Sequence, residues 1–400
     1  MPKLTLHDLP LKGQRVLMRV DFNVPQNKNG TISDDSRIRA ALPSIEFVLQ
    51  NGASLVLMSH LGRPKASVDL KYTLAPCAQR LSELLNIPVP LAPDCVGPKV
   101  EKMAAALHAG EVLMLENVRF HQAEEEPETD PSFTKQLAKL GTVYVNDAFG
   151  TAHRAHASTA LVAKCFPGKA AAGFLMESEL AHLTPLLHSP QHPFHAIIGG
   201  AKVSTKAGVI QNLLKLVDRL FIGGGMIFPF MKAKGIDVGA SMLDPEDVHT
   251  ARQILSHPKA DSLILPKDLV IASAFANDAE RKISPFTIDI PPHWFGMDIG
   301  PETVSSWADQ LKEARSIFWN GPVGVFEMPN FASGTNAIAQ ILSHANAQTI
   351  VGGGDSIAAI QQMHLTGKFT HLSTGGGASL EFLEFGHLPG VDALSDRKIH

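Results

Sequence analysis

The sequence predicts an α/β protein in which two doubly wound, parallel-sheet (Rossmann-like) domains are joined by a connecting helix. Short apolar runs rich in β-branched residues alternate along the chain with longer segments of helical period, a pattern typical of parallel sheets covered by helices on both faces. The chain has 400 residues, of which 44% are hydrophobic, and one hydrophobic core seldom serves so long a chain. Two domains are therefore expected.

The first half of the chain contains four short apolar runs that are expected to form strands, with segments of helical period between them. The strands are expected at residues 16–20, 55–58, 112–115 and 143–145, and the helices at 38–51, 74–85 and 133–140. This alternation predicts a parallel sheet with crossover helices.

The second half repeats the pattern with more strands. They are expected at residues 196–198, 220–222, 262–265, 316–319, 349–351 and 371–373, with helices at 209–217 and 337–344. Because these runs do not give the strand count of a closed barrel, two open sheets are preferred over a TIM barrel.

An amphipathic segment at residues 174–187, followed by a proline- and histidine-rich loop at 189–195, marks the expected domain boundary. The resulting division is an N-terminal domain at 1–174, a connecting helix and hinge at 175–187, a C-terminal domain at 188–385 and a tail at 386–400. The sequence leaves open whether the tail packs back on the N-terminal domain. It also leaves open a single large domain, in which the amphipathic segment is one more crossover helix.

Composition narrows the class of protein. The formal net charge is −4, so no global field attracts nucleic acid or acidic membranes, and any anion site must be a local cluster. Cys77, Cys95 and Cys165 lack metal-ligand spacing and favour a reducing compartment over a disulfide framework. No signal-peptide pattern follows Met1, and no apolar run approaches the ~18 residues of a membrane helix. The sequence thus predicts a cytoplasmic protein without nucleic-acid or membrane partners.

In the first half, polar and basic residues follow the expected strands, where ligands bind in open α/β sheets. Several guanidinium groups that converge there would clamp a phosphate or carboxylate, and Arg37 at a helix start would either join them or remain solvated. The candidates are Asp21, Phe22, Asn23, Arg37, His60, Leu61, Gly62, Arg63, Arg119 and Arg154.

Two other features of this half have simpler interpretations. His153 and His156 have the spacing of a metal-ligand pair, but Arg154 between them would repel a cation. The acidic run at 124–128 is expected to be a solvated loop.

Three glycine triplets, at 223–225, 352–354 and 375–377, follow expected strands in the second half. Glycine lets backbone N–H groups approach an anion closely, and a helix N-terminus favours negative charge. Neither a P-loop nor a complete G-x-G-x-x-G pattern occurs, so these two nucleotide-binding classes are not supported. A tight turn without ligand is the alternative for a single triplet. The candidates beside phosphates are Gly353, Gly354, Gly376 and Gly377, whereas Gly223 and Gly224 are expected to flank the adenine of a nucleotide.

Charged residues accompany these glycines. Lys202 and Lys206, four apart on a starting helix, can reach one phosphate chain or remain solvated. Asp355 and Ser356 follow a triplet, and Asp355 can bind Mg²⁺ beside phosphate oxygens or cap a helix. Glu327 can accept hydrogen bonds from ribose hydroxyls or lie on the surface.

Five segments of the chain resemble the phosphoglycerate kinase family. They are 19–25 (RVDFNVP), 59–64 (SHLGRP), 147–156 (DAFGTAHRAH), 199–204 (GGAKVS) and 373–379 (STGGGAS). The resemblance runs in the family's order from about residue 11 to about residue 394, and the motifs are long and specific.

The resemblance implies reversible transfer of the 1-phosphoryl group of 1,3-bisphosphoglycerate to Mg·ADP, giving 3-phosphoglycerate and ATP, by a monomeric enzyme whose domains close. It assigns Asp21 and Asn23 to the glycerate hydroxyl, and Arg37 to the reacting carboxyl. His60, Arg63, Arg119 and Arg154 are assigned to the 3-phosphate. In the second half it assigns Lys202 to the transferring phosphoryl group, Lys206 to the nucleotide phosphates, Glu327 to the ribose and Asp355 to Mg²⁺. Residues 353–356 line the phosphate site, and Gly376 and Gly377 supply helix-start amides.

No general base is expected, because both nucleophiles, an ADP oxygen and a carboxylate, are ionised at neutral pH. Two alternatives stay open: an acyl-phosphate kinase for another small acid, and a non-catalytic two-domain sensor of phosphorylated metabolites.

Overall fold

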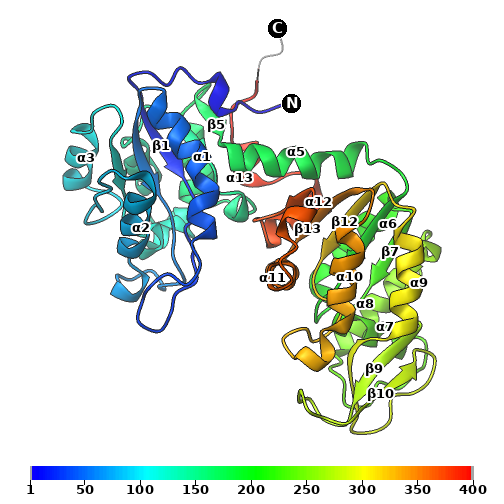
Figure 1. Ribbon diagram of the computed structural model, residues 1–400. Helices are drawn as coiled ribbons and strands as arrows, with labels where there is room; N and C mark the ends of the chain where they lie inside the picture. Colours follow the sequence, from blue (N-terminus) through cyan, green and yellow to red (C-terminus); the bar gives the residue numbers. More distant parts are fainter. Residues whose placement is uncertain (1, 398–400) are drawn as a thin grey trace. The chain divides into compact units, whose positions relative to one another are not determined.

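The computed structural model describes residues 2–397 and divides into two compact units (Figure 1). The first unit contains residues 2–181 and 387–397, and the second contains residues 182–386. Each unit is built on its own parallel sheet with helices around it. The predicted fold class, two doubly wound α/β domains, is confirmed.

The first unit contains a five-stranded sheet in the order β3-β2-β1-β4-β5, in which every pair of neighbours is parallel. The four predicted strands are all present, and β5 is additional because a run of three alanines carries no β-branched signal. The strands are β1 (Arg15–Arg19), β2 (Ser54–Met58), β3 (Val112–Met114), β4 (Val143–Asn146) and β5 (Ala170–Ala172).

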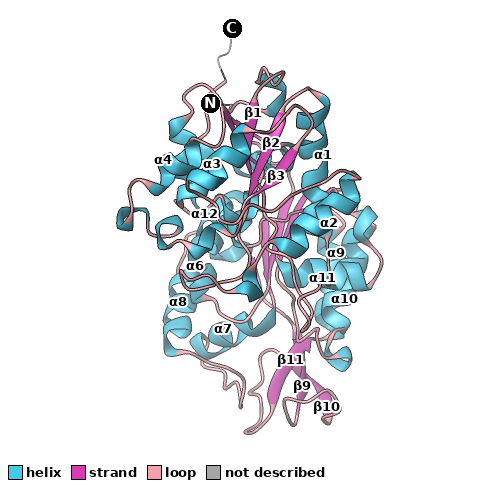
Figure 2. Cartoon of the chain, turned by 90° about the vertical axis from the view of Figure 1, so that its left-hand side faces the viewer, coloured by secondary structure: helices cyan, strands magenta, loops and turns pink. Residues whose placement is uncertain are grey.

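Helices cover both faces of this sheet. Figure 2 shows α1 (Ser36–Gln50) and α2 (Ala75–Leu85) on one side of β1 to β3, and α3 (Pro98–Ala105) and α4 (Phe133–Ala138) on the other. Alternate residues of each strand join the core under α1 and α2. The intervening Leu17, Val56 and Leu113 are buried as well, so these strands are apolar on both faces.

The C-terminal segment belongs to the first unit, although it follows the last helix of the second unit in sequence. The amide of Leu4 donates to the Ser395 carbonyl at 2.8 Å, and that of Gly390, in α13 (Pro389–Asp392), donates to the Ala152 carbonyl at 2.8 Å. Its position is therefore fixed by contacts with residues more than 200 positions earlier.

The second unit contains a six-stranded parallel sheet in the order β14-β13-β12-β6-β7-β8, which includes every strand predicted there. The loop predicted at 189–195 is shorter, because β6 already begins at Phe194 and His195 is buried in the sheet. The strands are β6 (Phe194–Ile198), β7 (Arg219–Ile222), β8 (Leu263–Ile264), β12 (Ser316–Asn320), β13 (Gln348–Gly352) and β14 (His371–Leu372).

Two groups of helices surround the second sheet (Figure 2). One core packs the sheet against α9 (Pro301–Leu311), α10 (Ser333–Ser343) and α11 (Gly354–Gln362). The other group contains α6 (Ala207–Leu216), α7 (Ile227–Ala233), α8 (Pro245–Leu255) and α12 (Gly377–Phe385).

The second unit also carries a three-stranded antiparallel sheet that the sequence did not predict. Its strands β9 (Asp268–Ala272), β10 (Arg281–Pro285) and β11 (Phe295–Ile299) pair in the order β10-β9-β11. It packs a small core around Ala272, Met297 and Phe331.

Helix α5 (Phe174–His188) starts in the first unit and ends in the second. Asp147 accepts from the amides of Leu175 and Met176, and Ser44 accepts from that of Phe174, so the start of the helix is fixed to the first unit. Across residues 2–397, none of the helices combines the length and the apolar character needed to span a membrane.

Candidate functional site

A buried arginine organises the polar cluster of the first unit. Arg19 ends β1 with 1% of its surface exposed, and its Nε donates to the Ser158 hydroxyl at 2.7 Å. One guanidinium nitrogen donates to the Val20 carbonyl, and the other lies 3.3 Å from Nδ1 of His60. Arg19 was not among the site residues predicted from the sequence, although an arginine inside an apolar strand was a usable signal, since a buried charge needs partners.

The loops after β1 and β2 are joined by hydrogen bonds, because these strands are parallel neighbours and end at the same edge of the sheet. Oδ1 of Asn23 accepts from the Gly62 amide at 2.9 Å. Arg37, the second residue of α1, donates from Nη1 to Oδ2 of Asp21. The structure therefore brings together the predicted Asp21, Asn23, Arg37 and Gly62.

Arg119 joins the same loops from the turn after β3. Its Nη1 donates to the Gly62 carbonyl at 3.0 Å, and its Nη2 forms an ion pair with Glu125 at 3.0 Å. Nε of Arg119 is buried and has no hydrogen-bond partner. Burial lowers the pKa of this guanidinium, and the charge of Arg63 contributes to that shift. A desolvated donor without a partner is a position where an anionic ligand would be favoured.

The acidic run is solvated at Glu125, Glu126 and Glu128, as the sequence predicted, but not at Glu124. Glu124 is fully buried and accepts from the Ser158 amide at 2.9 Å and from its hydroxyl at 2.6 Å. Burial raises the pKa of Glu124, and the Arg19 charge opposes that rise. Glu124 and Glu125 thus contact this basic cluster, because positive charges that sit close together need nearby carboxylates.

The two histidines of the cluster favour their neutral form. Burial, and then the charges of Arg19 and Arg119, hold the pKa of His60 well below its usual range. Burial and the Arg119 charge lower the pKa of His156 to about 4.

The remaining predicted residues of the first unit differ in exposure. Arg63 and Arg154 are exposed. The charge of Arg63 helps to lower the pKa of Arg119, and the charge of Arg154 helps to lower the pKa of His156. Phe22 and Leu61 are buried, so their side chains pack in the core and only their backbone can face a ligand.

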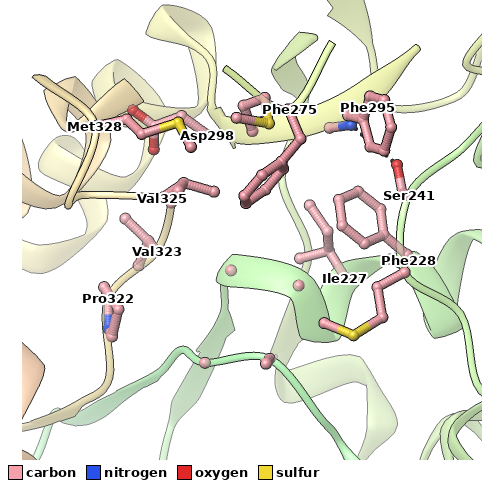
Figure 3. Close-up of a pocket in the computed structure, with 18 of the residues that line it drawn as sticks. Ile227, Phe228, Ser241, Phe275, Phe295, Asp298, Pro322, Val323, Val325 and Met328 are labelled. Atoms are coloured by element: carbon pink, nitrogen blue, oxygen red, sulfur yellow. Dashed lines mark hydrogen bonds between the residues drawn. The ribbon is translucent and has the colours of Figure 1, made fainter. Parts of the chain in front are cut away.

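The second unit contains a pocket of about 540 Å³ between the ends of its parallel strands and the antiparallel sheet. In Figure 3, the side chains of Ile227, Phe228, Phe275 and Val325 converge on this space. Phe228 is buried, with 5% of its surface exposed, and forms part of the pocket wall. The predicted residues in its wall are Gly224, Glu327 and Asp355.

Lys206 lies beside the glycine loops after β6 and β12. Its Nζ donates to the Gly199 carbonyl at 2.7 Å and to Oδ1 of Asn320 at 3.0 Å. Burial lowers the pKa of Lys206 to about 8, and the negative charge of Asp355 acts in the opposite direction. The ammonium group is therefore partly desolvated close to Asp355.

The start of α11 combines an exposed carboxylate with hydrogen-bond donors. Asp355 is exposed in the first turn, and the buried Ser356 hydroxyl accepts from the Gly321 amide at 2.7 Å. Nδ2 of Asn320 is buried without a partner, and a side chain at Gly353 would lie 3.2 Å from it. An unused donor beside a glycine loop is suited to an anionic oxygen.

The glycines fall into two groups. A Cβ at Gly223 would clash with Val323, and one at Gly224 with the Gly200 backbone, so packing alone requires glycine at these positions. Gly354 and Gly377 begin α11 and α12 with open space around a Cβ and without a left-handed φ. Gly376 has open space too, with φ of +51°. The protein's own packing does not require glycine at 354 or 377. A ligand that approaches the backbone closely would require it.

Lys202 and Glu327 are solvent-accessible. Nζ of Lys202 lies 3.7 Å from Oδ2 of Asp244, which caps the start of α8. Glu327 is exposed at the pocket wall. Lys202 can leave Asp244 for a ligand, because an exposed ion pair of this kind contributes little to stability.

Comparison with known proteins gives one family over nearly the whole chain. A family model described as phosphoglycerate kinase matches residues 6–386. A phosphoglycerate kinase of Chlorobium chlorochromatii is 52% identical over 401 residues, which cover 99% of this chain and 100% of the relative. The cytosolic phosphoglycerate kinase 3 of Arabidopsis thaliana is 52% identical over 397 residues, covering 98% of each chain.

A solved structure supports the same relationship. The phosphoglycerate kinase from Coxiella burnetii is similar with a TM-score of 0.88 at 40% identity, covering 98% of both chains. Since sequence and fold agree over almost the full length, this chain belongs to the phosphoglycerate kinase family, the phosphotransferases that move a phosphoryl group reversibly between 1,3-bisphosphoglycerate and ADP in glycolysis.

Proposed function

We propose that the first unit holds 3-phosphoglycerate or 1,3-bisphosphoglycerate through its basic cluster. His60, Arg63, Arg119 and Arg154 bind the 3-phosphate, and Asp21 and Asn23 bind the glycerate hydroxyl. The observation that carries this proposal is Nε of Arg119, a buried donor without a partner among converging positive charges. A phosphate oxygen would satisfy that donor and neutralise the cluster.

The second unit is proposed to bind ADP and ATP in the apolar pocket. The base lies against Gly223 and Gly224 and the aromatic wall, and Glu327 accepts from the ribose hydroxyls. Lys206, Gly353, Gly354 and Ser356 face the phosphates. The open space at Gly354 and the unpartnered amide nitrogen of Asn320 support this assignment.

Mg²⁺ is proposed to bind with the nucleotide through Asp355. A single exposed carboxylate fits this ion, because Mg²⁺ usually keeps several waters and binds through one or two carboxylates and substrate phosphates. When bound, the ion would neutralise phosphate charge. Lys206 already experiences the Asp355 charge, so the two side chains share one electrostatic environment.

Catalysis is proposed to rest on positioning and charge rather than on proton transfer. Arg37 faces the reacting carboxyl group, and Lys202 moves from its exposed pair with Asp244 to the transferring phosphoryl group. The amides of Gly376 and Gly377 add backbone donors at the start of α12. Because acid and nucleotide bind to different units, residues 175–187 are proposed as the hinge of a closure that excludes water.

We also propose that the chain works as a cytoplasmic monomer. The cytosolic plant relative supports the compartment. The monomeric state follows from the family resemblance, and sedimentation of the purified chain would test it.

A coupled assay with 3-phosphoglycerate and Mg·ATP tests the proposal. ADP formation should require 3-phosphoglycerate; formation with a different small acid instead would indicate another acyl-phosphate kinase, and binding without turnover would indicate a sensor.

Replacing Lys202 with alanine tests the role of this lysine. We expect kcat to fall far more than the nucleotide KM rises, because its interaction forms mainly in the transition state. Lys234→Ala, at an exposed lysine after α7, is the matched control. An unchanged kcat in Lys202→Ala would remove the assigned role.

A further inference from the structure

Three side chains with metal-binding atoms meet in the first unit. They are Asp94, Cys95 and His121, and their carboxylate oxygen, sulfur and ring nitrogen atoms lie within 4.8 Å of one another. His121 follows Cys95 by 26 positions in the sequence, so no short sequence motif contains all three residues. Within residues 2–397 this is the one such group found.

The sheet edge brings these residues together. Leu91 forms a parallel bridge to Met114, and the Ala92 amide donates to the Met114 carbonyl at 2.7 Å, so the segment before Asp94 runs beside β3. Both stretches then leave the sheet at the same edge. The segment after β3 continues through the turn 118–120 and places His121 at its end.

Two of the three donor atoms are already in direct contact, and the third lies within 4.8 Å of them. Nε2 of His121 lies 2.7 Å from Oδ1 of Asp94, and the Cys95 amide donates to the same oxygen at 2.6 Å. The His121 ring stacks on Phe133, with centroids 5.1 Å apart, which fixes the plane of the imidazole. Backbone and aromatic contacts of this kind hold ligands in place around metal sites.

The chemistry of the three donors selects the ion. Thiolate and imidazole ligands suit Zn²⁺, which takes four ligands at about 2.0–2.3 Å, whereas Mg²⁺ prefers an all-oxygen environment. Cys95 is fully buried, while Asp94 and His121 are partly exposed, so an ion can enter from solvent and keep a water as its fourth ligand. We propose that Asp94, Cys95 and His121 form a binding site for Zn²⁺ or a similar borderline divalent cation.

Binding releases the Cys95 thiol proton and displaces from Nε2 of His121 the proton shared with Asp94, so that both side chains can bind the cation. The site differs from the proposed Mg²⁺ site at Asp355, which lies in the second unit and offers no sulfur or imidazole. Because the folded chain assembles donors that are remote in sequence, an ion bound there should also stabilise the fold.

Cobalt(II) provides a spectroscopic probe, because it occupies zinc sites and a Co²⁺–thiolate bond adds a charge-transfer absorption band in the near ultraviolet. The full-length chain, reduced and freed of metal by a chelator, is titrated with Co²⁺ and then with Zn²⁺. We expect the band to saturate at one equivalent and to disappear when Zn²⁺ displaces Co²⁺. Zn²⁺ should also raise the melting temperature.

Single substitutions test which side chains bind the metal ion. Cys95→Ser should abolish the band, and Asp94→Asn and His121→Gln should each weaken Zn²⁺ binding at least about tenfold. The control is Cys165→Ser, which removes an exposed thiol outside the cluster and should leave the titration unchanged. Asp355→Asn shows whether metal bound at the proposed nucleotide site contributes to the titration. If Cys95→Ser fails to fold, the two variants at partly exposed positions still decide the question.

Absence of both the band and saturable Zn²⁺ binding would overturn the proposal. So would unchanged affinity in both Asp94→Asn and His121→Gln, or loss of the band in Cys165→Ser.

Discussion

Lys206 loses its proton more readily than a solvated lysine does. Burial lowers its pKa to about 8, with Asp355 opposing the shift. A positive charge is needed if this side chain is to bind nucleotide phosphates, so ionisation of the free enzyme should control nucleotide affinity.

We therefore expect ADP binding to weaken as pH rises through 8. With a folded-state pKa of about 8, one lysine in about ten stays charged at pH 9, which corresponds to about a tenfold loss of affinity. Titration calorimetry of ADP without Mg²⁺ between pH 7 and pH 9 measures the effect. Lys206→Arg, which remains charged over this range, should show a flatter profile. An equally steep profile in that variant would assign the titration to another group.

At the same scale, the predicted site residues differ in how visible they were in the sequence. Arg63 and Asp355 follow strands, and their chemistry could be inferred from type and position alone. Arg19 and Glu124 could not be assigned so easily, because their role depends on burial and on a shared hydrogen-bond partner. Both contact Ser158, which lies far from each of them in sequence.

Among the elements, the turn at 122–124 and the helical segment at 157–161 depend on one carboxylate. Glu124 accepts from the amide and hydroxyl of Ser158, and Arg19 donates to the same hydroxyl. Glu124→Ala should lower the free energy of unfolding by about 3 kcal/mol, because it leaves the buried Arg19 charge uncompensated. Urea denaturation followed by circular dichroism measures this loss.

Glu126→Ala removes an exposed carboxylate two positions along the same run and should change stability by less than about 0.5 kcal/mol. Equal stability of the two variants would mean that Glu124 is solvated, as the sequence suggested.

The starts of α11 and α12 test whether their glycines serve a ligand. Gly377→Ala adds a methyl group to open space at an ordinary φ, so stability should stay equal or rise by up to about 1 kcal/mol. Turnover should nevertheless fall at least about tenfold, because the methyl group occupies space needed for close approach to the backbone. Thermal denaturation and steady-state kinetics measure the two effects.

Gly367→Ala is the matched control, since this glycine also has open space and no left-handed φ but lies outside the proposed site. Its turnover should be unchanged. Full activity in Gly377→Ala would contradict the assignment of this helix start to a ligand.

The elements themselves were largely predictable. Apolar periodicity identified all six strands of the second parallel sheet, because buried parallel strands carry a continuous β-branched signal. The antiparallel strands β9 to β11 were missed. β10 is mostly exposed and has few apolar residues, whereas the apolar run Leu269–Ile271 of β9 was a usable signal. Strand β5 was missed because alanines favour helices as readily as strands.

For the whole molecule, the sequence indicated two sheets and a helix between them, and the structure contains both sheets and α5. The sequence left open whether the C-terminal segment packs back on the first domain. In the structure it belongs to the first unit, where it contacts Leu4 and Ala152, which are distant in sequence. The proposed division of labour assigns the acid to the first unit and the nucleotide to the second.

Titration calorimetry of two variants against both ligands tests this division directly. Arg63→Ala, at an exposed side chain of the first unit, should weaken 3-phosphoglycerate binding at least about tenfold and leave ADP affinity unchanged. Lys206→Met should do the reverse. Arg39→Ala, which removes an exposed arginine paired with Asp35, should change neither. If Arg63→Ala kept its full affinity for 3-phosphoglycerate, or if each variant weakened both ligands equally, the assignment of one substrate to each unit would be contradicted.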